Sequence, residues 1–413
     1  MALIVQKFGG TSVGTVERIK NVASRVMATR QAGHQVVVAV SAMAGETNRL
    51  VALVEALTPS YNKREYDVVV AAGEQVSVGL LCIALESMGC RAKSYLGWQI
   101  PFMTDDAFSK ARIVDVVGEK MRHDLDAGYV VVVAGFQGVD ANHNITTLGR
   151  GGSDTSAVAL AAALKADRCD IYTDVDGVYT TDPRIVPKAR RLDVISYDEM
   201  LEMASLGAKV LQIRSVELAK KYSVPVRVLS SLEENSQGTL LTEESNIMEN
   251  VVVSGITCDK NEAKITVRGV PDRPGLAASI FGPLAQANIN VDMIIQNISA
   301  SGETDITFTV PHGDYQQAMQ VLQQATQVIG ARDLLGNPEI AKVSAVGVGM
   351  RSHSGVAQKM FQTLASEGIN IQMISTSEIK ISVVVDEKYT ELAVRALHDA
   401  FELDKEMPGR ISG

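Results

Sequence analysis

The chain has 413 residues, of which 46% are hydrophobic and 21% charged, and its formal net charge is −9. This length exceeds what a single core usually holds, so we expect two or three domains of globular rather than disordered character. The negative charge argues against a general nucleic-acid or membrane-surface role, because both require concentrated positive charge. An anionic small substrate stays possible, since a local group of Lys and Arg side chains can override the global sign.

The N-terminal sequence MALIVQKFGG lacks the long apolar core of a signal peptide, and no run of about 18 apolar residues occurs. We therefore expect a cytoplasmic protein without a membrane span. The cysteines are scattered, with no CxxC spacing and no His pattern beside them, at Cys82, Cys90, Cys169 and Cys258. We predict reduced, mostly buried thiols and no structural metal site.

The first predicted unit is a strand at 2–8, a helix, and a strand at 36–40. Thr15 is the expected N-cap of the helix, and Gly33 is the expected stop. A strand, a helix and a strand within about 35 residues form a βαβ unit, which requires parallel pairing. Further strands are predicted at 129–133, 169–173 and 224–229, and helices at about 154–165 and 198–221. Residues 1–230 are thus predicted to form one α/β domain, an open, mostly parallel sheet with helices on both faces.

After Ser230 the composition becomes polar (SSLEENSQGTLLTEESN), which predicts a linker at 231–250. An internal repeat follows, with a constant offset of 80 positions: Gly275, Phe281, Ile289, Asn290, Met293 and Ile294 recur as Gly355, Phe361, Ile369, Asn370, Met373 and Ile374. Each copy reads as strand, helix, strand, strand, helix. The first copy covers 265–336, and the second, 343–403, runs out of chain before a fourth strand.

A β-rich run at 251–257 precedes the first copy and has no obvious partner there. We predict that this run completes the sheet of the second copy. The first small domain, 265–336, would then be inserted within a second one made of 251–264 and 337–413.

Glycine-rich turns that follow predicted strands carry the candidate chemistry, whereas GxxxxGK[ST], HRD and DFG motifs are absent. In the first turn, KFGGTS, Gly9 and Gly10 let backbone N–H groups approach an anion, and Lys7 adds positive charge. A tight turn with a solvated lysine is an equal alternative for this segment taken alone.

The second turn, TTLGRGGSDTS, opens the helix predicted at Ala157. A helix N-terminus gathers unpaired N–H groups, and Arg150 beside it can hold a carboxylate through two hydrogen bonds. Ser153 or Asp154 can instead simply cap the helix. Three glycines in four positions around an arginine are harder to explain by capping.

The third turn, TDVDGVYTTDPR at 173–184, combines acceptors for a base and ribose with Arg184 for phosphates, although a surface turn is the alternative. The fourth is SAMAGETN at 41–48, together with Glu74 in a small and apolar context. A partly buried carboxylate needs a partner, which a substrate ammonium would supply, and a helix cap is the competing interpretation. All four segments leave the carboxyl ends of predicted parallel strands, where open α/β sheets bind ligands.

In combination, KFGGTSV, VVVAVSAMAGETNRL, AAGEQVS, TTLGRGGSDTSA and YTDVDGVYTTDPR resemble the aspartokinases of the amino acid kinase family. The repeat, with VPDRPGLA and NINVDMI, resembles paired ACT domains, which have a ferredoxin-like βαββαβ fold. The resemblance covers nearly the whole chain and is to the form without a fused homoserine dehydrogenase. It implies transfer of the γ-phosphoryl group of MgATP to the β-carboxylate of L-aspartate, giving 4-phospho-L-aspartate. It also implies a place at the first step of lysine, threonine and methionine biosynthesis, with feedback inhibition by lysine, threonine or both through the ACT domains.

The resemblance also implies roles for individual residues. Lys7 is the catalytic cation, organised by Asp154, with Arg150 as a further catalytic group. The implied nucleotide site consists of Lys7, Gly9, Gly10, Thr173, Asp174, Tyr179, Asp182, Arg184 and Lys209. The implied aspartate site consists of Ser41, Thr47, Glu74, Arg150, Gly151 and Ser153, with Glu74 on the ammonium and Arg150 on the carboxylates. No metal ligand from the protein is implied beyond the Mg²⁺ that ATP carries.

Both ACT copies are implied to hold effector-binding residues, namely Asp272, Arg273, Pro274, Gly275, Leu276, Ala277, Asn290, Val291, Asp292, Gln296, Val356, Ala357, Asn370, Ile371 and Thr376. The second copy departs from the first, with Ser354 where Pro274 stands and Gln372 where Asp292 stands. We therefore predict that it binds a different ligand or serves as a pairing surface. The implied assembly is a homo-oligomer, or an α2β2 complex with a second chain started near Met248.

Two rival functions stay open from the sequence. One is another member of the same superfamily, acting on glutamate, N-acetylglutamate or carbamate. The other is an amino-acid-binding regulator whose kinase domain is inactive. The pairing of Glu74 with Arg150 favours a free amino acid, and the presence of Lys7, Arg150 and Asp154 argues against an inactive domain.

Overall fold

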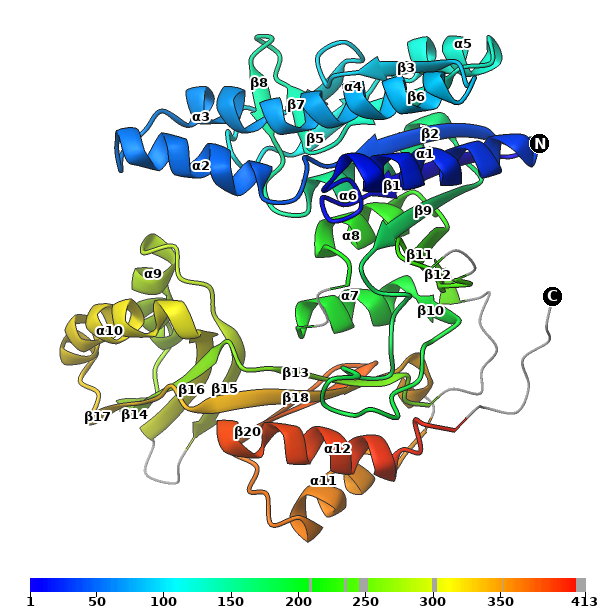
Figure 1. The fold of residues 1–413 in the computed structure, drawn as a ribbon. Coiled ribbons are helices and arrows are strands. Elements are labelled where there is room, and N and C mark those ends of the chain that lie inside the picture. The colour runs from blue at the N-terminus through cyan, green and yellow to red at the C-terminus, as the bar shows by residue number, and fades with distance from the viewer. Residues whose placement is uncertain (208–209, 234–235, 245–251, 299–302, 352, 406–413) are drawn as a thin grey trace. The chain divides into compact units, whose positions relative to one another are not determined.

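The computed structural model describes residues 1–413 except 208–209, 234–235, 245–251, 299–302, 352 and 406–413 (Figure 1). The chain divides into two compact units. The first consists of Met1–Val178, Arg191–Ser205 and Lys209–Met248. The second consists of Tyr179–Arg190, Leu206–Ala208 and Glu249–Gly413. The chain therefore enters the second unit twice before its C-terminal part.

An eight-stranded sheet forms the centre of the first unit (Figure 1). Its strands are β1 (Leu3–Phe8), β2 (Gln35–Val40), β3 (Ala92–Tyr95), β6 (Val130–Ala134), β9 (Arg168–Thr173), β10 (Val194–Ser196), β11 (Val226–Ser230) and β12 (Thr239–Thr242). Their order is β10-β12-β11-β9-β1-β2-β6-β3, and every pair except β11–β12 is parallel. This confirms the predicted open, mostly parallel sheet.

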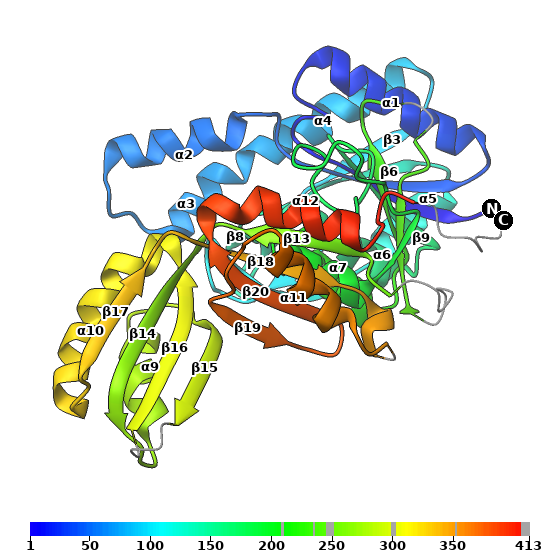
Figure 2. The same cartoon turned by 90° about the horizontal axis from the view of Figure 1, so that it is seen from below.

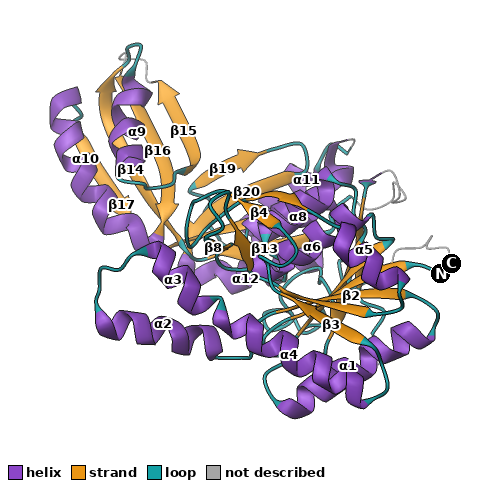
Figure 3. Cartoon of the chain, turned by 90° about the horizontal axis from the view of Figure 1, so that it is seen from above, coloured by secondary structure: helices purple, strands orange, loops and turns teal. Residues whose placement is uncertain are grey.

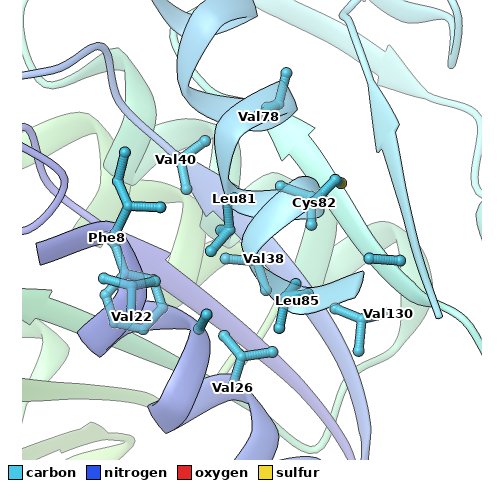
Figure 4. Close-up of a cluster of buried hydrophobic side chains, with 14 of the residues drawn as sticks. Phe8, Val22, Val26, Val38, Val40, Val78, Leu81, Cys82, Leu85 and Val130 are labelled. Carbon is cyan, nitrogen blue, oxygen red and sulfur yellow. The ribbon is translucent and has the colours of Figure 1, made fainter. Parts of the chain in front are cut away.

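Helices cover the sheet on both faces (Figure 3). On one face, α1 (Val16–Gln31) and α4 (Ala72–Ser87) bury apolar side chains against alternate residues of β2 (Figure 4). Val38 of β2 and Leu81 of α4 are completely buried in this core. Each such Val or Leu contributes about 1.5–3 kcal/mol on burial. On the other face lie α6 (Gly152–Leu164) and α8 (Ile213–Lys221), and α6 is buried along nearly its whole length.

The predicted signals at the ends of the first helix are confirmed. The hydroxyl of Thr15 accepts the N–H of Arg18 at 3.2 Å, so Thr15 is the N-cap of α1. After the helix, Gly33 adopts a φ of +85°, a conformation that glycine adopts without strain.

The single helix predicted at 198–221 is wrong. Two helices lie there, α7 (Tyr197–Ser205) and α8. Gly207, between them, has a φ of +103°, and a Cβ on it would lie 2.7 Å from the carbonyl oxygen of Cys258. The helical pattern is therefore interrupted where Leu206–Ala208 joins the second unit.

A second, smaller sheet in the first unit was not predicted. Its strands are β4 (Phe102–Thr104), β5 (Ile113–Val116), β7 (Gln137–Val139) and β8 (Ile145–Thr147), in the order β5-β4-β7-β8. The remaining helices of this unit are α2 (Glu46–Leu57), α3 (Lys63–Val70) and α5 (Glu119–Asp126). Strands of three or four residues are too short for an alternating pattern to stand out.

One helical stretch in the described part of the chain, Lys63–Ser87, has the length and apolar composition of a membrane span. It consists of α3 and α4, which follow each other almost without a break. Half of the apolar window is buried inside the protein, and Asp67 and Glu74 are among the buried residues. A core helix produces the same pattern.

The second unit contains two four-stranded sheets, each with helices beside it (Figure 2). The first sheet has the order β15-β16-β14-β17. Its elements are β14 (Glu262–Pro271), α9 (Leu276–Gln286), β15 (Asp292–Ile298), β16 (Glu303–Pro311), α10 (Tyr315–Ile329) and β17 (Asp333–Asn337). Ile280, Leu284, Phe308 and Leu322 are completely buried in its core.

The second sheet has the order β13-β18-β20-β19. Its elements are β13 (Gly255–Asp259), β18 (Ile340–Val346), α11 (Val356–Ser366), β19 (Met373–Thr376), β20 (Lys380–Asp386) and α12 (Thr390–Ala400). β13 precedes the whole first sheet in the chain, yet it pairs antiparallel with β18, from Gly255 opposite Val346 to Asp259 opposite Lys342. Gly275 and Gly355 both have left-handed φ values and stand before the first helix of their repeat.

Equivalent positions of the two repeats meet each other. Met293 and Met373, separated by the repeat offset, share one buried cluster. The ammonium group of Lys342, whose side chain is 4% exposed, lies 2.8 Å from Glu262 Oε1 and 2.7 Å from Asp292 Oδ2. The repeats are thus joined by an apolar contact and by a buried cation.

Replacing Lys342 by Met is expected to lower the free energy of unfolding by about 2–4 kcal/mol, because Glu262 keeps a largely buried charge without its cation. Denaturant titration followed by circular dichroism measures this change. The matched control is Lys405→Met, which removes an exposed ion pair with Glu402 and should leave the free energy of unfolding nearly unchanged. An equal loss in both variants would contradict a structural role for the buried cation.

Candidate active site

Three of the four candidate turns follow strands of the large sheet and leave it at one edge. The prediction is wrong for the second turn, TTLGRGGSDTS, which follows β8 of the smaller sheet, where β8 pairs antiparallel with β7. Lys7 of β1 stands in register between Ala39 of β2 and Ile171 of β9. Because these strands are parallel, the turns that follow them leave from the same edge. The backbone continues this register, since the N–H of Ser41 donates to the carbonyl of Phe8 at 3.1 Å.

Lys7 forms an ion pair with Asp154 inside the first unit. Lys7 Nζ lies 2.6 Å from Asp154 Oδ1, and the two side chains are only 10% and 12% exposed. Asp154 belongs to the first turn of α6, where the positive end of the helix dipole also favours a carboxylate. The pair holds an ammonium group at a defined place beside the glycine turn.

The glycine turn after β1 depends on a close approach of two backbone segments. A Cβ on Gly10 would lie 2.9 Å from the carbonyl oxygen of Ala42, in the turn after β2. A Cβ on Gly9 would lie 3.3 Å from Lys7 Nζ. Any larger residue here would crowd the turn or the ammonium group.

Glu74 is a buried carboxylate with one oxygen unused. The residue is 3% exposed; its Oε1 accepts the N–H of Ala42 at 2.9 Å, and its Oε2 finds no hydrogen-bond partner within the residues that the structure describes. Burial raises the pKa of Glu74 to about 7, although the N–H groups of Ala42 and of Glu74 itself lower it in part. Gly73 allows this placement, since a Cβ there would lie 2.7 Å from the Cβ of Ala42. A cation would satisfy this carboxylate.

Two serines from neighbouring turns meet. Ser41 Oγ and Ser153 Oγ lie 2.8 Å apart, which joins the turn after β2 to the start of α6. Thr47 is half-buried in the first turn of α2. Arg150 is exposed, just ahead of α6, and Gly151 precedes the helix with a φ of +69°. The structure thus places the hydroxyl groups of Ser41, Thr47 and Ser153 and the exposed Arg150 around the ends of β2 and β8.

Asp67 and Arg214 support the turn TTLGRGGSDTS, which carries Arg150, and neither residue was found by the sequence analysis. Asp67 is completely buried, and it accepts the N–H of Thr147 at 2.8 Å and the hydroxyl of Thr147 at 2.7 Å, together with the N–H of Ser109. Arg214 donates to the carbonyl of Leu148 at 2.6 Å. Burial raises the pKa of Asp67, although these hydrogen bonds oppose the rise. The two side chains fix the residues directly ahead of Gly149 and Arg150.

Replacing Asp67 by Asn is expected to weaken the candidate site from a distance. The amide replaces one acceptor oxygen by an NH2 donor, which would face the donors of Ser109 and Thr147, so the free energy of unfolding should fall by about 1–3 kcal/mol. Displacement of Arg150 should raise the KM for aspartate, the acceptor that the resemblance implies, about tenfold, while the KM for the implied ATP changes little. Steady-state kinetics and thermal unfolding measure both effects. The exposed control Asp126→Asn should change neither, and an unchanged Asp67→Asn variant would exclude the supporting role.

The residues assigned to the nucleotide fall into three groups. Thr173 ends β9 and donates its hydroxyl proton to Asp174 Oδ1 at 3.0 Å in the first unit. Tyr179, Asp182 and Arg184 lie on the segment that belongs to the second unit, where Asp182 accepts hydrogen bonds from Arg184, including one of 2.7 Å. Lys209 lies outside the described residues, as does Met248.

The residues assigned to effectors surround the N-terminal turns of α9 and α11. The turn ahead of α9 and the start of that helix are exposed at Asp272, Arg273, Pro274, Gly275 and Ala277, whereas Leu276 is buried. Three further residues lie on or just before β15, namely Asn290, Val291 and Gln296. The equivalent places in the second repeat are occupied by Val356, Ala357, Asn370, Ile371 and Thr376. Asp292 is engaged by Lys342. Burial would raise the pKa of Asp292, but the Lys342 ammonium outweighs it, so the pKa lies below its usual value.

Within the described residues, no group of three or more His, Cys, Asp and Glu side chains is arranged to hold a metal ion. All four cysteines are unpaired thiols; Cys82, Cys90 and Cys169 are buried and Cys258 is half-buried. Burial raises the pKa of all four, so they are inert neutral thiols.

Comparison with known proteins agrees with this organisation. The amino acid kinase family model matches residues 2–230, and an ACT domain model matches 265–326 and 343–401. The fold and the site thus define an amino acid kinase with two ACT domains.

Individual relatives show which amino acid kinases the chain resembles most specifically. The chain is 63% identical to an aspartokinase of Pseudomonas aeruginosa, over 98% of each chain. Crystal structures of aspartokinase III from E. coli are also similar. One, in complex with aspartate and ADP, has 28% identity, a TM-score of 0.80 and coverage of 96% of this chain and 99% of that one. The other, in complex with lysine and aspartate, has 29% identity, a TM-score of 0.76 and coverage of 97% and 99%. The chain belongs to the aspartokinases, within the amino acid kinase family.

Proposed function

We propose that the protein transfers the γ-phosphoryl group of MgATP to the β-carboxylate of L-aspartate, giving 4-phospho-L-aspartate and ADP. The observation that carries this proposal is Glu74, a buried carboxylate beside the sheet edge with one oxygen that lacks a partner. A free amino acid brings the ammonium group that this oxygen needs. The E. coli relative crystallised with aspartate and ADP supports the same pair of ligands.

The reaction needs no general base. The side-chain carboxyl of aspartate has a pKa of about 4, so the attacking oxygen is already ionised at neutral pH. The enzyme's work is to align two anions and to offset their charge. Lys7, held by Asp154 at 2.6 Å, supplies a cation beside the turn that carries Gly9 and Gly10, whose N–H groups we assign to phosphate oxygens.

The acceptor substrate is held at both ends in this proposal. Glu74 Oε2 accepts a hydrogen bond from the ammonium group, and Arg150 pairs with the carboxylates. Ser41, Thr47 and Ser153 add hydroxyl contacts, with Gly151 at the start of α6. An ammonium bound to Glu74 also opposes the effect of burial on its pKa, so the bound state holds Glu74 ionised.

The nucleotide is assigned to Lys7, Gly9, Gly10, Thr173, Asp174, Tyr179, Asp182, Arg184 and Lys209. The charges of the phosphates are shared between Mg²⁺, which arrives with ATP as part of the substrate, and the cations of the protein. We assign no protein side chain as a ligand of this ion.

Regulation is assigned to the second unit. We infer that lysine, threonine or both bind the ACT residues and favour an inactive arrangement, and the E. coli structure with bound lysine supports this. The first domain, 265–336, is inserted within the second, made of 251–264 and 337–413, and the pairing of β13 with β18 supports this insertion. The predicted linker at 231–250 includes β12, which belongs to the large sheet, so the catalytic domain, predicted at 1–230, extends beyond its predicted end. Calorimetric titration with each amino acid, alone and with the other present, measures the coupling, and independent binding would exclude concerted inhibition.

The cellular setting follows as part of the same proposal. We place the reaction at the entry to lysine, threonine and methionine biosynthesis in the cytoplasm. The assembly is a homo-oligomer or an α2β2 complex with a chain started near Met248. A single full-length band from untagged native material would exclude the second assembly.

An ADP-release assay tests the proposed activity. With MgATP constant, the enzyme should release ADP with L-aspartate and not with glutamate, N-acetylglutamate or carbamate. Stoichiometric formation of an acyl phosphate, trapped with hydroxylamine, confirms the acceptor. Turnover with another acceptor, or none at all, would overturn the assignment in favour of the other superfamily members or an inactive regulator.

A further inference from the structure

The segment Tyr179–Arg190 is built into the second repeat, although it lies between two parts of the first unit in the chain. It closes on itself, because the N–H of Thr180 donates to the carbonyl of Arg190 at 2.9 Å and the N–H of Arg190 donates to Thr180 Oγ1 at 3.0 Å. The carbonyl of Thr180 accepts the N–H of Ile256, in β13, at 2.8 Å. The base of the segment is thus tied to the sheet of the second repeat.

Apolar packing fixes the same segment. Val186 is 2% exposed and belongs to the core of the second repeat, together with Leu397 of α12. Ile185 and Ala189 pack against that core. Arg395 of α12 donates to the carbonyl of Ile185 at 3.0 Å. These contacts fix the segment to α12, so it is part of the second repeat rather than a free surface loop.

The central polar contact joins Thr180 to His398. Both side chains are completely buried, and Thr180 Oγ1 lies 2.9 Å from His398 Nε2. The hydroxyl already accepts the N–H of Arg190, so its own proton is available for donation to the imidazole. Burial lowers the pKa of His398, which leaves the ring neutral at pH 7 and able to accept. His398 Nδ1 finds no hydrogen-bond partner among the described residues, so the contact to Thr180 is its anchoring bond.

We propose that His398 is a positioning residue for nucleotide binding, acting through Thr180 on the segment that carries Asp182 and Arg184. This inference rests on the proposed function, because it takes these two residues as nucleotide contacts. The Arg184 side chain is 90% exposed and is held by Asp182 of the same segment, so the position of both residues depends on the anchored base of that segment. The segment Tyr179–Arg190 belongs to the second unit and is continuous in the chain with the first unit at both of its ends. Through it, the second repeat is connected to the residues assigned to the nucleotide, in addition to its connection through the linker.

The test compares four variants of the full-length enzyme in steady-state kinetics. Thr180→Val and His398→Leu remove the hydrogen bond with little change in volume and should raise the KM for ATP about tenfold, the usual effect of one lost buried hydrogen bond. The KM for aspartate should change less than about twofold. Thr180→Ser and His398→Gln retain a hydroxyl and an acceptor, and they should restore the KM for ATP to within about threefold of wild type.

A surface control and a direct probe keep structural effects separate. Lys188→Met removes an exposed ion pair with Asp399 from the same segment and should leave both KM values unchanged. Hydrogen exchange of a peptide that covers 179–190 should quicken in His398→Leu, while peptides from α1 stay protected. Equal changes in both KM values, or an unchanged KM for ATP with faster exchange, would overturn the positioning role. A wild-type enzyme that releases no ADP with aspartate would instead overturn the proposed function.

Discussion

Replacing Lys7 by Met is expected to lower kcat by about 10³-fold, because a preorganised cation at developing charge contributes on the order of 3–4 kcal/mol to the transition state. The variant also leaves Asp154 with a largely buried charge and no partner, so its free energy of unfolding should fall by about 3 kcal/mol. ADP release under saturating substrates measures the first effect, and denaturant titration measures the second.

The double variant Lys7→Met with Asp154→Asn separates the two effects. Without an unpaired carboxylate, much of the lost stability should return, while kcat should stay at the level of Lys7→Met. Asp154→Asn alone should leave Lys7 in place but less well held, with a smaller loss of activity. A Lys7→Met enzyme with robust turnover would remove Lys7 from the catalytic role and, with it, the proposed mechanism.

Replacing Glu74 by Gln is expected to stabilise the ligand-free protein and to impair it as an enzyme. The folded-state pKa of about 7 lies above the unfolded value of 4.5, so the wild type loses stability as the pH rises from about 4.5 to about 7, because the unfolded chain releases this proton before the folded protein does. Gln avoids that cost while its oxygen still accepts the N–H of Ala42, so at pH 8.5 we expect a gain of about 1–3 kcal/mol. The KM for aspartate should rise about 100-fold, because the ammonium group loses a buried charged partner.

The pH dependence provides the control for Glu74. At pH 4 the carboxyl is protonated in both the folded and the unfolded state and resembles the amide, so the difference in stability should largely vanish there. In the wild type, kcat/KM for aspartate should fall as pH drops below 7, since a neutral carboxyl cannot pair with the ammonium group, whereas Glu74→Gln should lack this fall. Thermal unfolding from pH 4 to 8.5 measures the difference in stability, and initial rates from pH 5.5 to 8.5 measure kcat/KM. If kcat/KM for aspartate fell below pH 7 in Glu74→Gln as it does in the wild type, the titrating group would be a residue other than Glu74.

The meeting of the turns after β1, β2 and β9 at one sheet edge could be predicted, because parallel strands order their carboxyl ends and these strands are long enough to show an apolar run. The turn that carries Arg150 instead follows the short strand β8 of the smaller sheet, which gave no such signal. Lys7 and Glu74 were found from the sequence, the latter because a charge stood alone among small apolar residues. The repeat was visible from identities such as Gly275 and Gly355. These features are encoded locally or at a fixed offset.

What could not be predicted depends on long-range contacts. Asp67 shows no local signal, since its partners lie 42 and 80 residues further along the chain. The break at Gly207 looked like an acceptable helix interior until the approach of Cys258 was known. The membership of Tyr179–Arg190 in the second unit is likewise invisible, because Val186 looks like any loop valine until its neighbours in the second repeat are known.

The pairing of β13 with β18 has a consequence for how the chain matures on the ribosome. Gly255 emerges from the ribosome long before Val346, the residue opposite it, so β13 has no pairing strand until the entire first sheet has been synthesised. At about 5–20 residues per second this delay lasts roughly 5–18 seconds, during which one strand edge is open to wrong partners. Early closure of the first sheet brings the two ends of that insert together and shortens the search that β13 must make. Codon changes that slow translation between the two strands should therefore increase aggregation of the nascent chain without altering the finished protein.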